Sequence, residues 1–362
     1  MKNLHLSELH KTAGATFTSV GNWELPGDYG DSAEEYKVIK AGAGLIDQSH
    51  FGRIKIEGKD ALDLLNRLST YKVDILPVGS GEGTILLTNK GRVIDLVHLF
   101  AKEDGLMMIT SPEAAEQTSE WIDLYTFLEE VILEDVTIST AMLTLTGPKS
   151  DHIVEKAFKF DPNQLALYGN AELQVNDETI SIIRTDPLGE LGYSFVMESS
   201  QAQGVWETLV SQGASQVGNE SYNAVRIESG ITRYGNELTE KVNPWEVNLN
   251  KYIHWDKGCY TGQEVVLRLY NYNKVRRQLV SIEPLSDKIV EGAQLKSDGT
   301  EVGWVSSLSI NPMTQRQMGL AIVHVDHIEP DKPIQAHDFN DVVLGDVITN
   351  PIPEKQLSSN PA

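Results

Sequence analysis

Hydrophobic and polar residues alternate with two different periods along the first three quarters of the chain. Residues 53–57 alternate with a period of two, which predicts a strand, and residues 59–70 carry Leu62, Leu65 and Leu68 on one helical face. Similar patterns predict strands over residues 84–87, 93–101, 106–110, 136–146, 179–185 and 193–197, and helices over residues 147–158, 202–212 and 220–228. Strands and helices therefore mix here, as in an α+β protein.

A further helix is predicted after the strand that ends near Thr110. Residues 111–113, Ser-Pro-Glu, combine a capping residue, a proline and an acidic side chain, which together mark a helix start. Four apolar side chains then recur at three- and four-residue spacing and are expected to be buried: Trp121, Leu124, Tyr125 and Leu128.

The pattern changes after about residue 278. Helix signals vanish, and short strands alternate with turns such as residues 297–300, which predicts a separate small β-barrel or sandwich over residues 278–348. Residues 350–362 contain three prolines and are expected to form a loose tail. A chain of 362 residues exceeds one ordinary core, so two or three domains are expected, the larger region covering residues 8–272.

Composition narrows the classes of partner and location. The formal net charge of −22 argues against nucleic acid or an anionic membrane as the main partner. No apolar run approaches the roughly 20 residues of a membrane span, and the first eight residues lack the apolar core of a signal peptide. Together with the single cysteine, these features predict a cytoplasmic protein.

The octapeptide of residues 257–264, Lys-Gly-Cys-Tyr-Thr-Gly-Gln-Glu, holds that one cysteine. Cys259 has no second thiol for an internal disulfide, and alone it does not complete a zinc or iron–sulfur site. Three chemical roles stay open for it: a nucleophile, one ligand of a shared metal centre, or a redox-sensitive thiol. Lys257 would favour the thiolate form of Cys259. The alternative interpretation is that Cys259 is a small, buried hydrophobic residue.

Just after the octapeptide, cations and aromatic residues interleave: Arg268, Tyr270, Tyr272, Lys274, Arg276 and Arg277. In so acidic a chain this segment suggests an anionic small molecule, although a solvated strand edge would show the same pattern. No metal site is predicted, because His324 and His327 lack a third ligand.

Asp95 lies in a predicted strand whose two faces are both apolar. Such a carboxylate must be paired, hydrogen-bonded or protonated, because its burial alone costs several kcal/mol. A functional role or a structural ion pair with an arginine would each explain it.

Two further charged residues are candidates for ligand contacts. Glu190 lies in a glycine-flanked turn, where a carboxylate can bind an aminopyrimidine or guanidine-like group, although turn carboxylates are commonly just solvated. Arg226 lies in a helix that ends at Gly230, before the polar, aromatic loop of residues 231–237. It could hold an anion or an aromatic ring, or form a surface ion pair.

In their order along the chain, these segments resemble the folate-binding YgfZ and glycine-cleavage T-protein superfamily. The resembling segments are residues 21–30, 43–50, 89–96 and 185–193, Arg226, residues 234–237 and the octapeptide. The octapeptide is the signature of the YgfZ branch, which the resemblance therefore favours, since T-proteins have no such cysteine. The resemblance implies an α+β, three-lobed architecture with mixed and antiparallel sheets around a central folate channel. Residues 8–272 would form two lobes, and a β-barrel would follow.

The resemblance also implies tetrahydrofolate, or a one-carbon derivative, as the ligand. Glu190 and Arg226 would hold the pterin, Asp95 would accept a hydrogen bond or a proton, and Cys259 would supply the thiol. Arg268 and Lys274 would meet the glutamate tail of the folate. The full expected set comprises Asp95 and Cys259 as catalytic residues, and Asp95, Glu190, Arg226, Tyr234, Lys257 and Arg268 as folate-binding residues.

Three functions follow from this resemblance. The YgfZ branch implies support of iron–sulfur cluster assembly or repair, with iron–sulfur client or assembly proteins as partners. The alternative is an enzyme, either a tetrahydrofolate-dependent aminomethyltransferase served by a lipoyl carrier protein or a folate-dependent demethylase. A module that only stores or senses folate is the third.

Overall fold

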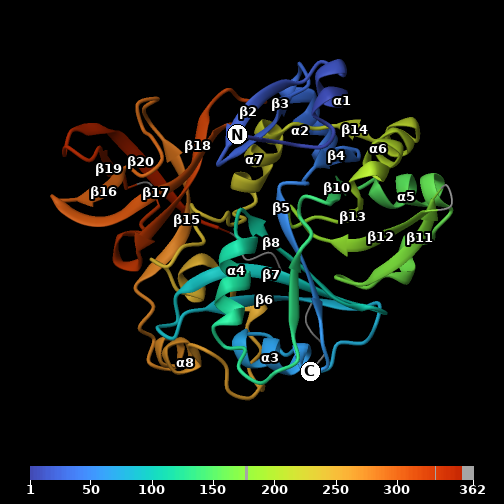
Figure 1. Cartoon of the computed structure of the whole chain (residues 1–362). Helices are drawn as coiled ribbons and strands as arrows, with labels where there is room; N and C mark the ends of the chain where they lie inside the picture. The colour runs from blue at the N-terminus through green and yellow to red at the C-terminus, as the bar shows by residue number, and fades with distance from the viewer. Residues whose placement is uncertain (176–177, 331, 353–362) are drawn as a thin grey trace.

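The computed structural model describes residues 1–175, 178–330 and 332–352. Over this part of the chain the fold is α+β, with three lobes arranged around a common centre (Figure 1). This agrees with the architecture expected from the sequence. None of the helices in these ranges is long and apolar enough to cross a membrane.

The first lobe is built on the sheet β6-β7-β8-β5-β9. Its strands are β5 (Phe51–Glu57), β6 (Gly81–Leu87), β7 (Val93–Lys102), β8 (Gly105–Pro112) and β9 (Ile132–Asp135). Helices α3 (Ala61–Leu68) and α4 (Ala115–Asp123) cover one face, where Leu64 and Leu65 pack against Ile54 and Val97. The opposite face carries Phe100 and other apolar residues toward the centre of the molecule.

The second lobe is built on the sheet β11-β12-β13-β10-β4-β14. Its strands are β4 (Gly44–Asp47), β10 (Thr140–Thr146), β11 (Asn170–Val175), β12 (Glu178–Thr185), β13 (Gly192–Glu198) and β14 (Ser215–Gln216). Helices α5 (Ser150–Phe158) and α6 (Ala202–Ser211) cover its outer face, with Trp206 packed on Phe195 and Leu143. Met142 and Val196 face the centre, so the inner faces of the two sheets share one apolar core.

The N-terminal segment and α7 complete this body. A small sheet, β1-β3-β2, is formed by β1 (Lys2–Asn3), β2 (Thr16–Val20) and β3 (Trp23–Asp28), beside α1 (Ser7–Thr12). Helix α2 (Ser32–Ala41) packs on α7 (Asn219–Glu228). Short 3-10 turns cover residues 162–164, 199–201, 244–247, 250–252 and 325–327.

The C-terminal lobe is a closed barrel with the strand order β15-β18-β17-β16-β19-β20. Its strands are β15 (Arg277–Pro284), β16 (Gln294–Ser297), β17 (Thr300–Ile310), β18 (Gln317–His324), β19 (Ile334–His337) and β20 (Val343–Pro351). The predicted barrel is thus present. Asn350 and Pro351, placed in the tail by the sequence pattern, pair with Ser281 and Val280 of β15. Residues 353–362 of that predicted tail lie outside the described residues.

Several local predictions differ from the structure. The predicted helix start at residues 111–113 is wrong, because Ser111 and Pro112 belong to β8, Glu113 has a φ of +64° and helix α4 begins only at Ala115. Residues 136–139, predicted as the start of a strand, lie between β9 and β10.

Helix α4 ends at Asp123, and Leu124 and Leu128 are 69% and 96% exposed, so their predicted burial is wrong. The reason is local hydrogen bonding, since the Glu129 carboxylate accepts from the backbone N–H groups of Phe127 and Leu128 and holds the chain in a loop.

Another difference lies at the end of the octapeptide. Gly262 has a φ of +83°, and helix α8 (Gln263–Asn271) begins directly after it. The positive φ is tolerated because glycine has no Cβ. Helix α8 was not expected from the pattern, and it carries part of the segment of cations and aromatic residues.

Candidate functional site

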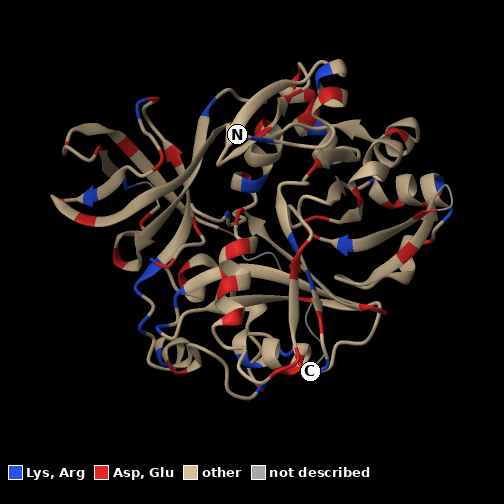
Figure 2. Ribbon diagram, in the orientation of Figure 1, with Lys and Arg blue, Asp and Glu red and all other residues tan. Residues whose placement is uncertain are grey.

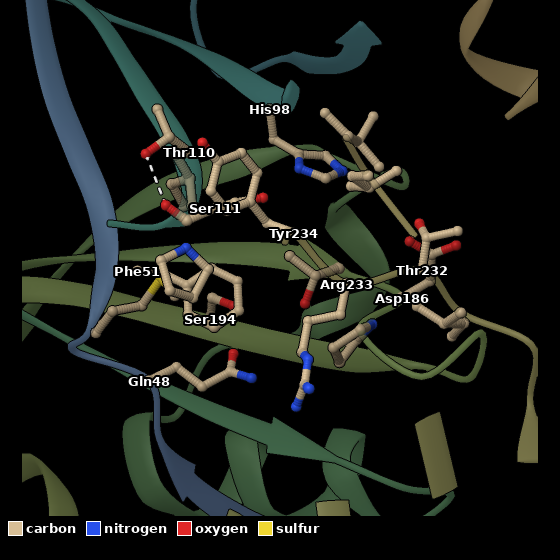
Figure 3. A pocket seen from close by; sticks show the side chains of 18 of the residues that line it. Gln48, Phe51, His98, Thr110, Ser111, Asp186, Ser194, Thr232, Arg233 and Tyr234 are labelled. Carbon is tan, nitrogen blue, oxygen red and sulfur yellow. Dashed lines mark hydrogen bonds between the residues drawn. The ribbon is translucent and has the colours of Figure 1, made fainter. Parts of the chain in front are cut away.

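A cavity of about 210 Å³ lies where the inner faces of the first two lobes meet. Figure 3 shows its labelled side chains converging from distant parts of the chain. Strand β7 contributes Leu96, His98 and Phe100, and β8 ends with Thr110 and Ser111 in the wall. Gln48, Phe51, Asp186 and Ser194 line it from the second lobe and the start of β5, and the loop after α7 adds Thr232, Arg233 and Tyr234.

Asp95 is fully buried and lies directly behind this wall. Its Oδ2 accepts from the N–H of Ser111 at 3.0 Å, and its Oδ1 accepts from the N–H of Leu96 at 2.9 Å. Burial raises the pKa of Asp95 to about 7, although the hydrogen bonds from Ser111 and Leu96 act in the opposite direction. It has no ion-pair partner among the described residues, so its carboxyl group can hold a proton near neutral pH.

Glu190 does not reach the cavity. It is exposed in the turn between β12 and β13, four residues beyond the acid that does line the cavity, Asp186. Asp186 accepts from the Tyr168 hydroxyl at 3.1 Å and from Lys251 Nζ at 3.0 Å. Its position directly after a predicted strand was the signal that could have identified it.

Arg226 lines the cavity and joins three parts of the fold. Its Nη1 donates to the carbonyl of Ile231 at 2.6 Å and to Glu237 Oε2 at 3.2 Å, and its Nη2 donates to Ser307 Oγ at 2.9 Å. Its Nε donates to Asn223 Oδ1 at 2.9 Å. Burial lowers the pKa of Arg226, and the charge of Glu237 partly offsets this. Every nitrogen of the guanidinium is thus already hydrogen-bonded to the protein.

The loop that Arg226 holds presents two side chains to the cavity. The Tyr234 hydroxyl donates to Gln117 Oε1 of α4 at 2.7 Å, which connects the loop to the first lobe. Arg233 keeps 28% of its side chain exposed, and its guanidinium donates to Asn236 Oδ1 at 3.0 Å. Arg233 was not singled out in the sequence, yet it is the accessible cation of the cavity wall.

An aromatic cluster closes the end of the cavity near Asp186. The His98 ring lies 5.0 Å from that of Tyr168 and 6.0 Å from that of Tyr252, and the two tyrosine hydroxyls are 3.3 Å apart. Burial lowers the pKa of His98 to about 4, so its imidazole is neutral at neutral pH. The pattern of hydrophobic residues gave no reason to select these three residues, because they come from separate elements.

Lys257, Cys259 and Arg268 lie outside the cavity. The Lys257 ammonium donates to the carbonyls of Asn66, Ser69 and Tyr71 at 2.5–2.8 Å, at the C-terminal end of α3. Cys259 is a free, exposed thiol. Figure 1 shows α8, which carries the exposed Arg268, beside α3 at the lower edge of the first lobe.

The charge distribution separates the two regions further. Figure 2 shows Lys and Arg residues gathered along the chain that leads from α8 into β15, whereas α4 is mainly acidic. The predicted cationic segment is therefore a surface feature away from the cavity. No group of three or more His, Cys, Asp or Glu side chains in the described ranges could hold a metal ion.

Comparison with known proteins covers almost the whole chain. The sequence profile of the GCVT N-terminal domain matches residues 6–257, and that of the glycine cleavage T-protein C-terminal barrel domain matches residues 277–352. An aminomethyltransferase of Halothermothrix orenii is 29% identical over 359 residues, covering 97% of this chain and 99% of the relative. One from Thermotoga neapolitana is 27% identical over 352 residues, covering 93% and 96%.

A solved structure shares the fold. The glycine cleavage system aminomethyltransferase T from Bartonella henselae superposes with a TM-score of 0.84 at 23% identity, covering 97% of each chain. The relatives bear the aminomethyltransferase name, and none of those described here is of the YgfZ type. With two matching domains in the order seen in the structure, this chain belongs to the glycine cleavage T-protein family.

Proposed function

We propose that this chain is a tetrahydrofolate-dependent aminomethyltransferase that binds the folate in its central cavity. The observation that carries the proposal is a cavity walled by both α+β lobes, within a fold that aminomethyltransferases share over nearly their full length. On the sequence alone, the YgfZ role was the first hypothesis and aminomethyl transfer the alternative. Aminomethyl transfer is thus the better supported of the two functions.

The cavity wall suits the pterin end of a folate. Aromatic side chains such as Phe51, Tyr168 and Tyr234 offer faces for a flat ring, and Asp186 offers a carboxylate to ring N–H groups. The Thr185 hydroxyl oxygen is buried in the same wall, and none of the described residues is its hydrogen-bond partner. The volume of this cavity lies below the roughly 300–1,000 Å³ of pockets that enclose a whole ligand. It therefore fits a pterin ring whose tail extends out of the cavity.

Roles for the chain's own groups follow from this arrangement. Bound tetrahydrofolate would supply the secondary amines that accept the one-carbon unit. Asp95, behind Ser111, would hold or release a proton within the wall that faces the reacting groups. Arg233 would meet the folate carboxylates, Arg226 would keep the loop of residues 231–237 in place, and the lobes would exclude water.

Product formation by the purified protein tests this function. With an aminomethylated lipoyl carrier protein and tetrahydrofolate, we expect 5,10-methylenetetrahydrofolate, and we expect Asp95→Asn to lower its rate at least tenfold. Absence of product from the wild-type protein, while a bona fide aminomethyltransferase turns over the same carrier, would exclude the activity.

One observation favours a second candidate, the YgfZ-type role in iron–sulfur cluster assembly or repair. Cys259 is exposed beside Gly258, at a loop that Lys257 fixes to α3, so the thiol is available to a partner protein. Cells carrying Cys259→Ala would then lose activity of an iron–sulfur enzyme. Unchanged activity in those cells would remove the support for this role.

A further inference from the structure

We infer that a second, smaller cavity next to the central one binds the ammonia that aminomethyl transfer releases. Its volume is about 20 Å³, and about 10–15 Å³ suffices for one molecule the size of water. It lies between the end of β4, strand β3 and the first turn of α7. This inference rests on the proposed function and assigns a site to the smallest product of that reaction.

The chemistry of the reaction produces such a molecule inside the central cavity. During aminomethyl transfer the methylene carbon breaks its bonds to the lipoyl sulfur and to its amine nitrogen, and it forms bonds to two nitrogens of tetrahydrofolate. The two protons that these nitrogens lose go to the sulfur, which leaves as a thiol, and to the amine, which leaves as ammonia. Ammonia that stays beside the methylene carbon can attack it and reverse the transfer, so a separate site favours the product.

The two cavities share part of their walls. Gln48 and Tyr222 line both of them. Figure 3 shows Gln48 at the side of the central cavity that lies away from His98. Burial raises the pKa of Tyr222, although its hydrogen bond with Gln48 acts in the opposite direction, so the hydroxyl is protonated at neutral pH. A molecule that moves from the central cavity into the second one therefore passes side chains that can hydrogen-bond to it.

His50 offers the second cavity a buried nitrogen. The residue is 8% exposed, and its Nδ1 has no hydrogen-bond partner among the described residues. Burial lowers the pKa of His50 to about 4, so its imidazole is neutral at neutral pH and Nδ1 can accept a hydrogen bond. A buried polar atom without a partner is unfavourable, and a small donor in the cavity would satisfy it.

Asp47 favours ammonium over water in this cavity. Burial raises the pKa of Asp47, but its interactions with His10 and Ser49 outweigh this effect and hold the pKa below the ordinary value, so the group is a carboxylate. It is the only charged side chain among the described residues that line the cavity.

The carboxylate of Asp47 can accept further hydrogen bonds. His10 Nε2 lies 3.1 Å from Oδ2, and the N–H of Ser49 donates to Oδ1 at 3.0 Å, which leaves one acceptor position on each oxygen. The amide of Asn219, the first residue of α7, lines the same cavity. Acceptors from Asp47, His50 and Asn219 suit ammonium, whose N–H groups are all donors, better than water.

The reverse reaction tests this site, because ammonium is then a substrate. We would supply 5,10-methylenetetrahydrofolate, dihydrolipoyl carrier protein and ammonium chloride to the wild-type protein, His50→Phe and Asn219→Leu. In both variants the KM for ammonium should rise at least about fivefold, while the KM for 5,10-methylenetetrahydrofolate stays within about twofold. His152→Phe, at an exposed position of α5, makes the same change away from both cavities and should alter neither constant.

Thermal unfolding detects the site without turnover. At equal concentrations, ammonium chloride should raise the unfolding midpoint of the wild-type protein above that in methylammonium chloride by about 1–2 °C. The reason is that a cavity of this size has no room for the additional methyl group. The difference between the two salts should vanish in His50→Phe and persist in His152→Phe.

The outcomes separate this inference from the proposed function. An unchanged KM for ammonium in both cavity variants, or a rise of both KM values together, would overturn the ammonia site and leave the proposed function in place. Equal midpoints of the wild-type protein in the two salts would show that the cavity takes up water alone, and would also overturn the site. A wild-type protein without turnover, but with a midpoint difference that His50→Phe abolishes, would support the site and contradict the proposed function.

Discussion

The Asp95 carboxyl group accepts two backbone hydrogen bonds and has no charged partner in the described part of the chain. The sequence predicted its burial correctly, because apolar residues flank it on both sides in β7. It did not reveal that Leu96, the next residue, lines the cavity while Asp95 lies behind Ser111. That relation depends on the pairing of β7 with β8, which alternation within one strand does not specify.

The pH dependence of stability tests the state of Asp95. Its pKa rises from 3.8 to about 7 on folding, so between these pH values the folded protein holds a proton that the unfolded chain has lost. The free energy of unfolding of the wild-type protein should therefore fall, relative to Asp95→Asn, by up to about 1.4 kcal/mol per pH unit across this window. Urea denaturation of both proteins from pH 4 to 8 measures it, and parallel pH profiles would show that the carboxylate is ionised throughout.

At the scale of elements, Lys257 attaches the octapeptide to the end of α3. The sequence suggested that its charge activates the neighbouring thiol, but three backbone carbonyls receive its ammonium, and burial lowers its pKa to about 8. Such a C-terminal cap has no signature in the pattern of residues 257–264, since its acceptors lie almost 200 positions earlier in the chain.

Replacing Lys257 should therefore destabilise the protein. Lys257→Met removes the donors of three carbonyls and should lower the free energy of unfolding by about 2–3 kcal/mol. Cys259→Ser, two residues away but exposed, should change it by less than about 0.5 kcal/mol. Chemical denaturation monitored by circular dichroism compares the two variants. Equal effects would argue against the capping role.

A second connection between elements joins α7 to the barrel. Ser307 of β17 accepts from Arg226 and donates to Glu237 Oε1 at 2.6 Å, and all three residues are buried. The sequence suggested a ligand contact for Arg226, because a helix residue alone does not show that its partners come from a distant barrel.

Ser307→Ala should expose the dependence of the loop on this network. It leaves Glu237 without one donor and Arg226 Nη2 without its acceptor, so the free energy of unfolding should fall by about 1–3 kcal/mol. The affinity for tetrahydrofolate should also decrease, because Tyr234 and Arg233 lie on the loop. Ser309→Ala, at a partly exposed position of the same strand, serves as the control. Identical stability of the two variants would contradict the role of the network.

At the scale of the whole molecule, motifs in the right order were enough to predict the three-lobed fold and its C-terminal barrel. They were not enough for the cavity, whose wall joins Gln48, His98, Asp186 and Tyr234 from separate elements. The acid that lines the cavity is Asp186, four residues before the expected Glu190. Such a difference depends on how the turn after β12 packs against Tyr168 and Lys251, and no local pattern specifies it.

The most direct test of the account is calorimetric titration of tetrahydrofolate into the wild-type protein and into a variant whose cavity is filled. Leu96→Trp places a larger side chain in the cavity wall, and Arg268→Ala removes an exposed cation outside it. We expect the wild-type protein and Arg268→Ala to bind tetrahydrofolate with similar affinity, and Leu96→Trp to lose at least tenfold. Binding that Leu96→Trp leaves unchanged, or no binding by the wild-type protein, would contradict the central claim that folate occupies this cavity.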